Sequence, residues 1–172
     1  MCAVSLHFPE PTGPPLPRSD VFLAYLDYFR CVIVSKLQGL SEDQLRTSVL
    51  PSGWTVLELA KHLTYVERRW LVWGFEGEFV TEPWGDSRDG RWYVSAEEDP
   101  ADVVRAMQRQ GDVSRSVVRA HQLSDVGKPG ERWDGAEPPT LERVLFHLLQ
   151  EYARHAGHVD ASRELLDGKI GE

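Results

Sequence analysis

The feature that most constrains this sequence is a helical period of apolar residues that recurs in four long segments. Apolar side chains repeat every three or four residues over about 20–40, 56–74, 100–121 and 141–167. This spacing places them on one face of an α-helix. No segment convincingly shows the alternation that predicts a strand. Because four amphipathic helices bury their apolar faces best against one another, the sequence predicts an all-α four-helix bundle.

Local signals mark the ends of these segments. We expect Ser19 to cap the first helix, because its side-chain oxygen can accept a hydrogen bond from the first turn. Thr55 and Glu58 form the capping box that is typical of a helix start. Gly168 follows the last apolar residues of the fourth segment and is its expected stop.

The remaining residues form a lead-in and two long connections. Residues 1–18 carry five prolines and no apolar period. We therefore expect a flexible lead-in, followed by a single domain over residues 19–172. Residues 75–98 and 122–139 mix glycine, proline and aromatic side chains, which predicts long irregular connections. Connections of this length in a compact domain are usually functional or disordered.

Composition excludes several classes of protein. Among 172 residues there are 19 Lys and Arg against 27 Asp and Glu, a formal net charge of −8. That charge argues against nucleic acid as a partner, because such binding depends on neutralising phosphates. No apolar run reaches the roughly 20 residues that span a bilayer, and no secretory leader is recognisable, so we expect a cytoplasmic protein. The two cysteines, Cys2 and Cys31, cannot make a disulfide framework, so any metal must use histidine and carboxylate ligands.

Polar groups interrupt the apolar face of the fourth segment. His147, Glu151, His155 and His158 follow one another at spacings of four, four and three residues. On a helix they fall within an arc of about 80°. Burial of these groups without partners is costly, and a divalent cation would satisfy several of them at once. A further ligand would come from a facing helix, where His62 lies at the edge of an apolar face.

Spacing alone does not select the ligand pair in the fourth segment. His147 and Glu151 are one helical turn apart, and so are Glu151 and His155. Three protein ligands would leave coordination positions for water or substrate, which is the arrangement of a catalytic site. The alternative is a plain bundle without metal, in which hydrogen bonds satisfy the polar stripe.

Six tryptophans are many for this length and are candidates for the walls of a substrate pocket. Trp70 and Trp73 follow the apolar face of the second segment, so we expect them in the core. Trp84, Trp92 and Trp133 lie in the irregular connections, where they would form pocket walls or a dimer contact.

Other polar residues are interpreted more simply. Glu67 falls inside the apolar face of the second segment, and we expect an exposed edge or an ion pair there. No function is assigned to His7 in the lead-in or to His121 near the end of the third segment. Cys31 is expected in the core.

Motifs in two parts of the chain carry a resemblance to a known family. The pattern ExARHxGHxD occupies residues 151–160, and the motifs SGWT, AKHL and ERRW begin at residues 52, 60 and 67. In these motifs the chain resembles the actinobacterial branch of the DinB/YfiT-like metalloenzymes. The similarity covers roughly residues 20–170, with the motifs in the expected order and at the expected separations.

The resemblance implies a topology and a ligand set. Family members are four-helix bundles of up-down-down-up topology with one metal ligand on the second helix and two on the last. Carried onto this sequence, the ligands are His62, Glu151 and His155. His158 would lie near the open face of the metal as a general base, with His147 beside the ligands. Many family members have histidine where this chain has Glu151. Because a carboxylate ligand suits several divalent metals, the metal is not fixed by the resemblance: zinc is expected first, with nickel, iron or manganese as alternatives.

The resemblance also implies a reaction. Relatives of known activity are S-transferases and isomerases that use a low-molecular-weight thiol, and the actinobacterial branch implies mycothiol. The metal would lower the pKa of the thiol, which would then attack a small electrophile. Trp54, Trp84, Trp92 and Trp133 are the candidates for the cosubstrate pocket, and a homodimer is the expected assembly. The alternative is a non-catalytic metal-binding protein of a stress response.

Overall fold

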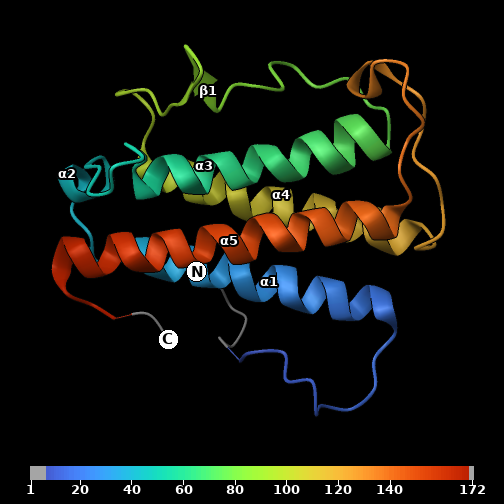
Figure 1. The fold of residues 1–172 in the computed structure, drawn as a ribbon, viewed down its shortest axis with the longest axis horizontal. Coiled ribbons are helices and arrows are strands. Elements are labelled where there is room, and N and C mark those ends of the chain that lie inside the picture. Colours follow the sequence, from blue (N-terminus) through green and yellow to red (C-terminus); the bar gives the residue numbers. More distant parts are fainter. Residues whose placement is uncertain (1–6, 171–172) are drawn as a thin grey trace.

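The computed structural model describes residues 7–170, and its main feature is a bundle of four long helices (Figure 1). These helices are α1 (Arg18–Leu37), α3 (Val56–Glu67), α4 (Pro100–Ala120) and α5 (Leu141–Asp167). The shorter helices are α2 (Glu42–Leu45), the π-helix η1 (Arg68–Phe75) and the 3-10 turn η2 (Glu131–Trp133). Two short strands, β1 (Ser87–Arg88) and β2 (Arg91–Trp92), pair as an antiparallel hairpin.

The order of helix directions is unusual for a bundle. Figure 1 shows α3 and α4 running in the same direction, opposite to α1 and α5. The topology is therefore up-down-down-up, as expected. Two parallel neighbours need a long connection between them, and residues 76–99 cross the length of the bundle from the end of η1 to the start of α4. No helix among the described residues is both long enough and apolar enough to cross a bilayer.

The ends of the helices follow from local sequence, with one exception. The Thr55 hydroxyl accepts from the backbone N–H of Glu58, and the Glu58 carboxylate accepts from the N–H of Thr55, so the capping box is confirmed. α5 ends at Gly168, whose φ of 76° is the left-handed conformation that favours glycine. The prediction for Ser19 is wrong. α1 begins two residues earlier than predicted, at Arg18 after Pro17, so Ser19 lies inside its first turn and does not cap the helix.

Two segments contain structure that the sequence did not predict. The connection over 75–98 holds the β1–β2 hairpin, although no period of two marks it. The second helical segment ends in the π-helix η1, a rare conformation that often occurs at functional sites. Gly74 lies within η1, and a Cβ there would lie 2.9 Å from the Trp133 ring and 3.0 Å from the Arg69 carbonyl oxygen. Glycine thus allows η2 to approach η1 closely.

The interior is built from leucine, valine and aromatic side chains of all four long helices. The largest side chains that are fully buried include Leu26, Ile33, Leu57, Leu63, Leu71, Leu145 and Tyr152. Cys31 is also buried, as expected. Trp70 and Trp73 are only half-buried. Trp70 packs against Trp133 of η2 and His147 of α5, and Trp73 lies near Arg132 of η2.

One ion pair lies at the centre of this core. The Glu67 carboxylate is fully buried and accepts hydrogen bonds from Arg30 of α1, Ser114 of α4 and Tyr152 of α5. Arg30 Nε lies 2.7 Å from Glu67 Oε1. The expected ion pair of Glu67 is confirmed. The alternative prediction, that Glu67 lies at an exposed edge, is wrong, because the residue is fully buried. Removing one partner of such a buried pair typically costs about 3–5 kcal/mol.

The described part of the lead-in contacts α1 through one aromatic residue. The Phe8 ring packs edge-on against Tyr25 and Tyr28, with ring centroids 5.6 and 5.3 Å apart. His7 is exposed. The division into a flexible lead-in and a domain over 19–172 stays a prediction, and Cys2 lies outside the described residues.

Candidate metal centre

Three side chains of metal-ligand type converge between α3 and α5. His62, Glu151 and His155 each offer one ligand atom, and these atoms all lie within 4.8 Å of one another. Glu151 and His155 are one turn apart on α5, so both leave the same face of that helix. α3 packs against that face and places His62 opposite them. Two imidazoles and one carboxylate at this separation suit a divalent cation.

In both histidines of this group, a ring nitrogen is already engaged. His62 Nδ1 lies 2.9 Å from Asp86 Oδ2. His155 Nε2 lies 3.3 Å from Glu151 Oε2, while its Nδ1 lies 3.3 Å from His158 Nδ1. The contact with Asp86 fixes the orientation of the His62 ring and leaves its Nε2 for a metal, as is usual for metal-binding histidines. In His155, the contact with His158 leaves Nε2 facing Glu151, the other proposed ligand on α5.

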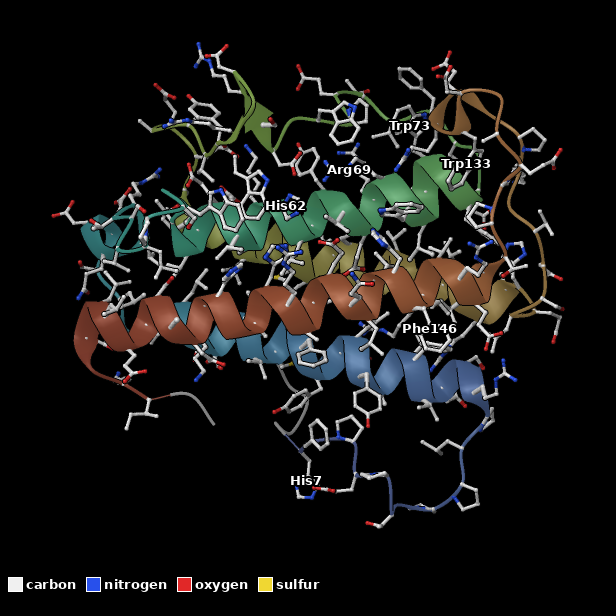
Figure 2. All side chains as sticks on the ribbon, in the orientation of Figure 1. His7, His62, Arg69, Trp73, Trp133 and Phe146 are labelled. Carbon is white, nitrogen blue, oxygen red and sulfur yellow. The ribbon has the colours of Figure 1, made fainter. Side chains whose placement is uncertain are left out.

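Asp86 is one of the site residues that sequence reasoning missed, together with Arg69 and Arg132. Asp86 lies in the crossing connection, yet it is only 2% exposed. Besides meeting His62, its carboxylate accepts from Arg69 of η1, with Nη1 at 2.6 Å from Oδ1 and Nη2 at 3.1 Å from Oδ2. Figure 2 shows His62 and Arg69 on the α3–η1 side of the bundle, beneath this connection. No spacing rule relates a residue of an irregular connection to a helix, so the sequence carried no signal for Asp86.

Stacked aromatic rings wall one side of the site. The Trp92 indole stacks on the His62 ring, with centroids 3.9 Å apart, and Trp54 stacks on Trp92 at 4.0 Å. Trp54 also meets His158 edge-on at 5.3 Å. The hairpin residue Trp92 therefore holds His62 in place by packing, while Asp86 holds it by a hydrogen bond.

A cavity of about 330 Å³ opens beside the three ligand-type groups. The other residues that line it include Trp54, Trp70, Trp84, Trp92, Arg69, Arg132, Arg154 and His147. Three of the four tryptophans predicted for the pocket are therefore at its wall. The fourth, Trp133, is not among the lining residues and packs against Trp70, with ring centroids 5.8 Å apart. Trp70 lines the cavity although we expected it in the core.

The two remaining histidines of α5 lie on different sides of the site. His147 lines the cavity, with its Nε2 3.7 Å from Glu151 Oε1 and its ring 4.3 Å from the Trp70 ring. His158 is not among the lining residues. It contacts the nitrogen of His155 that faces away from Glu151, a position from which it can orient His155. Its predicted part as a general base stays a prediction.

The surroundings of His62 and Glu151 favour the protonation states that metals require. Burial lowers the pKa of His62 despite the opposing effect of Asp86, so the neutral imidazole is favoured at pH 7. The hydrogen bond from His155 lowers the pKa of Glu151, which keeps the carboxylate charged. Neutral imidazole and ionised carboxylate are the forms that bind a metal ion.

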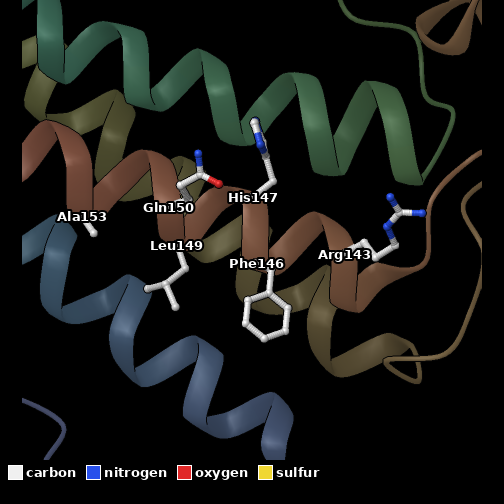
Figure 3. Close-up of a pocket in the computed structure, with 6 residues that line it drawn as sticks. All are labelled: Arg143, Phe146, His147, Leu149, Gln150 and Ala153. Atoms are coloured by element: carbon white, nitrogen blue, oxygen red, sulfur yellow. The ribbon is translucent and has the colours of Figure 1, made fainter.

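A second, more open depression lies on the outer face of α5. It measures about 480 Å³ and is lined by Arg143, Phe146, His147, Leu149, Gln150 and Ala153 (Figure 3). Figure 3 shows Phe146 and Leu149 pointing toward α1, whereas His147 points toward α3. All six residues come from one helix, and no set of polar groups converges there, so the cavity beside His62 is the candidate site.

The topology and the His, Glu, His group together define a DinB-like bundle. Among solved structures, the chain is similar to YfiT from Bacillus subtilis, which is described as a probable metal-dependent hydrolase with an unusual four-helix bundle topology. The TM-score is 0.63, and the match covers 94% of this chain and 95% of that chain. Sequence identity is 16%, so this likeness concerns the fold alone.

The family is established by sequence. The family model of the mycothiol-S-transferases matches residues 21–168, and the chain therefore belongs to the mycothiol-S-transferase family. No curated protein matches the chain significantly. The resemblance to DinB/YfiT-like proteins that the motifs indicated is confirmed by these two matches.

Proposed function

We propose that this protein is a divalent-metal-dependent enzyme that uses mycothiol as a cosubstrate and acts as an S-transferase or isomerase on a small electrophile. The observation that carries the proposal is the convergence of His62, Glu151 and His155 at the edge of a cavity. Membership of the mycothiol-S-transferase family supports the choice of thiol. We further propose that the protein works in the cytoplasm, and we keep the homodimer as an expectation.

The donor set supports a catalytic rather than a structural metal. Three protein ligands leave coordination positions for a thiol or water, whereas structural sites are usually closed by four. Asp86 and His158 orient the two imidazoles. Zinc remains the first expectation, and nickel, iron and manganese suit the same donors.

The proposed reaction gives each residue of the site a separate role. A divalent cation held by the three ligands would lower the pKa of a thiol so that the thiolate forms near neutral pH. Trp54 and Trp92 would exclude water from one side of the site. His147 would accept a proton in the cavity, because burial lowers its pKa and keeps the imidazole neutral. His158 would act through His155, whose ring it contacts.

Metal analysis tests the ligand assignment. We expect about one divalent ion per purified chain and loss of that ion in Glu151→Ala. Glu164→Ala is the matched control, since Glu164 is an exposed glutamate on the same helix. Full metal occupancy in Glu151→Ala would contradict the assignment of Glu151 as a ligand.

A thiol-consumption assay tests the reaction. Mycothiol and a panel of small electrophiles are incubated with the metal-loaded protein, with glutathione and bacillithiol as comparison thiols. We expect mycothiol to be consumed fastest, and only when metal is present. If no thiol is consumed with any electrophile and spectroscopy finds the metal fully coordinated by protein, the alternative of a non-catalytic metal-binding stress protein is favoured.

A further inference from the structure

Three guanidinium groups line the cavity beside the proposed metal ligands. They belong to Arg69, Arg132 and Arg154. Arg69 pairs with Asp86, but no ion pair to Arg132 or Arg154 occurs anywhere in residues 7–170. Although the whole chain carries a charge of −8, Glu151 is the only carboxylate among the described residues that line this cavity. The cavity is therefore a cationic region on an acidic protein, and such a region attracts anions.

Aromatic faces hold Arg132 in position without neutralising it. Its guanidinium carbon lies 4.6 Å from the ring centroid of Trp70, 5.5 Å from that of Trp133 and 5.9 Å from that of Trp73. Cation–π contacts of this kind fix a guanidinium but leave its charge and its N–H donors available. Arg132 is thus preorganised as a donor for a ligand.

One donor atom of Arg132 has no partner. Its Nε is buried and makes no hydrogen bond with any described residue. Native proteins seldom leave buried polar atoms unsatisfied, and such an atom calls for a physical explanation. Burial and the nearby charge of Arg69 lower the pKa of Arg132, as expected for a cation that faces another cation. An anion bound to the Arg132 guanidinium would offset the repulsion between the two cations.

The neighbours of Arg132 connect it to the metal centre. Trp70 lies under Arg132 and against His147, and His147 in turn meets Glu151. Trp84 lies across the cavity with Arg69 over its ring at 4.4 Å. A ligand held by Arg132 would therefore lie in a cavity that Trp70, Trp84, Glu151 and His62 also line.

We propose that the cavity binds a small carboxylate through Arg132, with the apolar or unsaturated body of that molecule against Trp70 and Trp84 and its reactive end near His62 and Glu151. The planar guanidinium matches a carboxylate with two parallel hydrogen bonds. A volume of about 330 Å³ fits a small organic acid. This inference rests on the proposed function, because it assigns the carboxylate to the electrophile, but it is testable without turnover.

The test compares a carboxylate with its neutral amide. Phenylacetate and phenylacetamide are titrated into the metal-loaded protein by calorimetry. We expect phenylacetate to bind at least tenfold more tightly, and Arg132→Gln to abolish that preference while leaving the affinity for the amide unchanged. Arg119→Gln is the matched control, since Arg119 is an exposed arginine of α4 away from the cavity. Equal affinities in the wild type would overturn the proposal.

Two further titrations separate the remaining explanations. If Arg132→Gln still bound phenylacetate more tightly than phenylacetamide, the proposal would be overturned, because the carboxylate would then bind the metal or Arg154. Arg132→Lys should keep part of the preference, since the charge remains while the paired donors are lost. If Arg132→Gln does not fold, Arg132→Lys replaces it in the test. A preference for phenylacetate that is partly retained in Arg132→Lys then supports the site, and complete loss of that preference in stable, metal-loaded Arg132→Lys counts against it.

A titration in the presence of mycothiol shows whether Arg132 binds the electrophile or the thiol. With mycothiol at saturation, unchanged affinity for phenylacetate supports the assignment to the electrophile. Competitive displacement by mycothiol overturns that assignment, because the thiol would then occupy Arg132. None of these titrations needs thiol consumption, so a failed activity assay and a failed carboxylate preference are separate results.

Discussion

Substitution of Asp86 by asparagine should weaken metal binding at the proposed centre. The Asp86 carboxylate serves three donors: Oδ1 faces Arg69, and Oδ2 faces both Arg69 and His62. Asparagine has nearly the same shape but only one acceptor oxygen. If that oxygen faces His62, the amide N–H₂ faces a guanidinium donor. If the amide is turned round, its N–H₂ faces His62 Nδ1 and favours the tautomer with a proton on Nε2, the nitrogen left for the metal.

The size of the effect follows from the position of Asp86 behind a ligand. Removing the partner of a metal-binding histidine typically lowers metal affinity about 10–100-fold. This corresponds to about 1.4–2.7 kcal/mol of binding free energy. The assay is a competition titration with a chromophoric chelator, with the melting temperature measured on the same samples.

Asp89→Asn is the matched control for this experiment. Asp89 lies in the turn of the β1–β2 hairpin, three residues after Asp86, is exposed and has a φ of 52°, a conformation that asparagine adopts well. We expect its metal affinity to equal that of the unsubstituted protein. If Asp86→Asn bound metal as tightly as this control at an unchanged melting temperature, Asp86 would not orient a metal ligand and the reasoning would be refuted.

Gly111→Ala should destabilise the bundle by about 1–3 kcal/mol, because a Cβ at that position would lie 3.0 Å from Arg30 Nε in the buried ion pair. Gly157→Ala, on α5 with open space around it, should instead stabilise by about 0.5–1 kcal/mol; denaturant unfolding of both variants checks the contrast. Metal affinity should persist at pH 7 and fall as the solution is acidified through the lowered pKa values of His62 and Glu151, where protons displace the metal. Affinity that stayed constant through that acidification would count against imidazole and carboxylate ligands.

The sequence predicted those parts of the molecule that depend on neighbours along the chain. With α3 and η1 taken together, the bounds of the four long helical segments agree with the apolar period to within three residues, because amphipathic segments bury the same face in any bundle. The pairing of Glu151 with His155 on one face of α5 follows from a spacing of four residues. The motifs then indicated which groups of α5 to combine with His62, a choice that spacing alone left open.

Tertiary structure decided everything that depends on residues distant in sequence. Glu67 has its place in the buried ion pair because α1, α4 and α5 each bring a donor to it. Asp86 became part of the site because the crossing connection folds back over α3, and no period marks a residue in such a connection. Trp70 reached the cavity rather than the core.

The physical reason for this division is the range of the interactions. Helix formation and capping are set within one or two turns, so the sequence by itself determined the helices and the face that carries Glu151 and His155. Hydrogen bonds, stacking and ion pairs between elements depend on how the helices and the connection pack. Only the folded chain could therefore place Asp86 behind His62 and leave Arg132 unpaired beside the proposed metal centre.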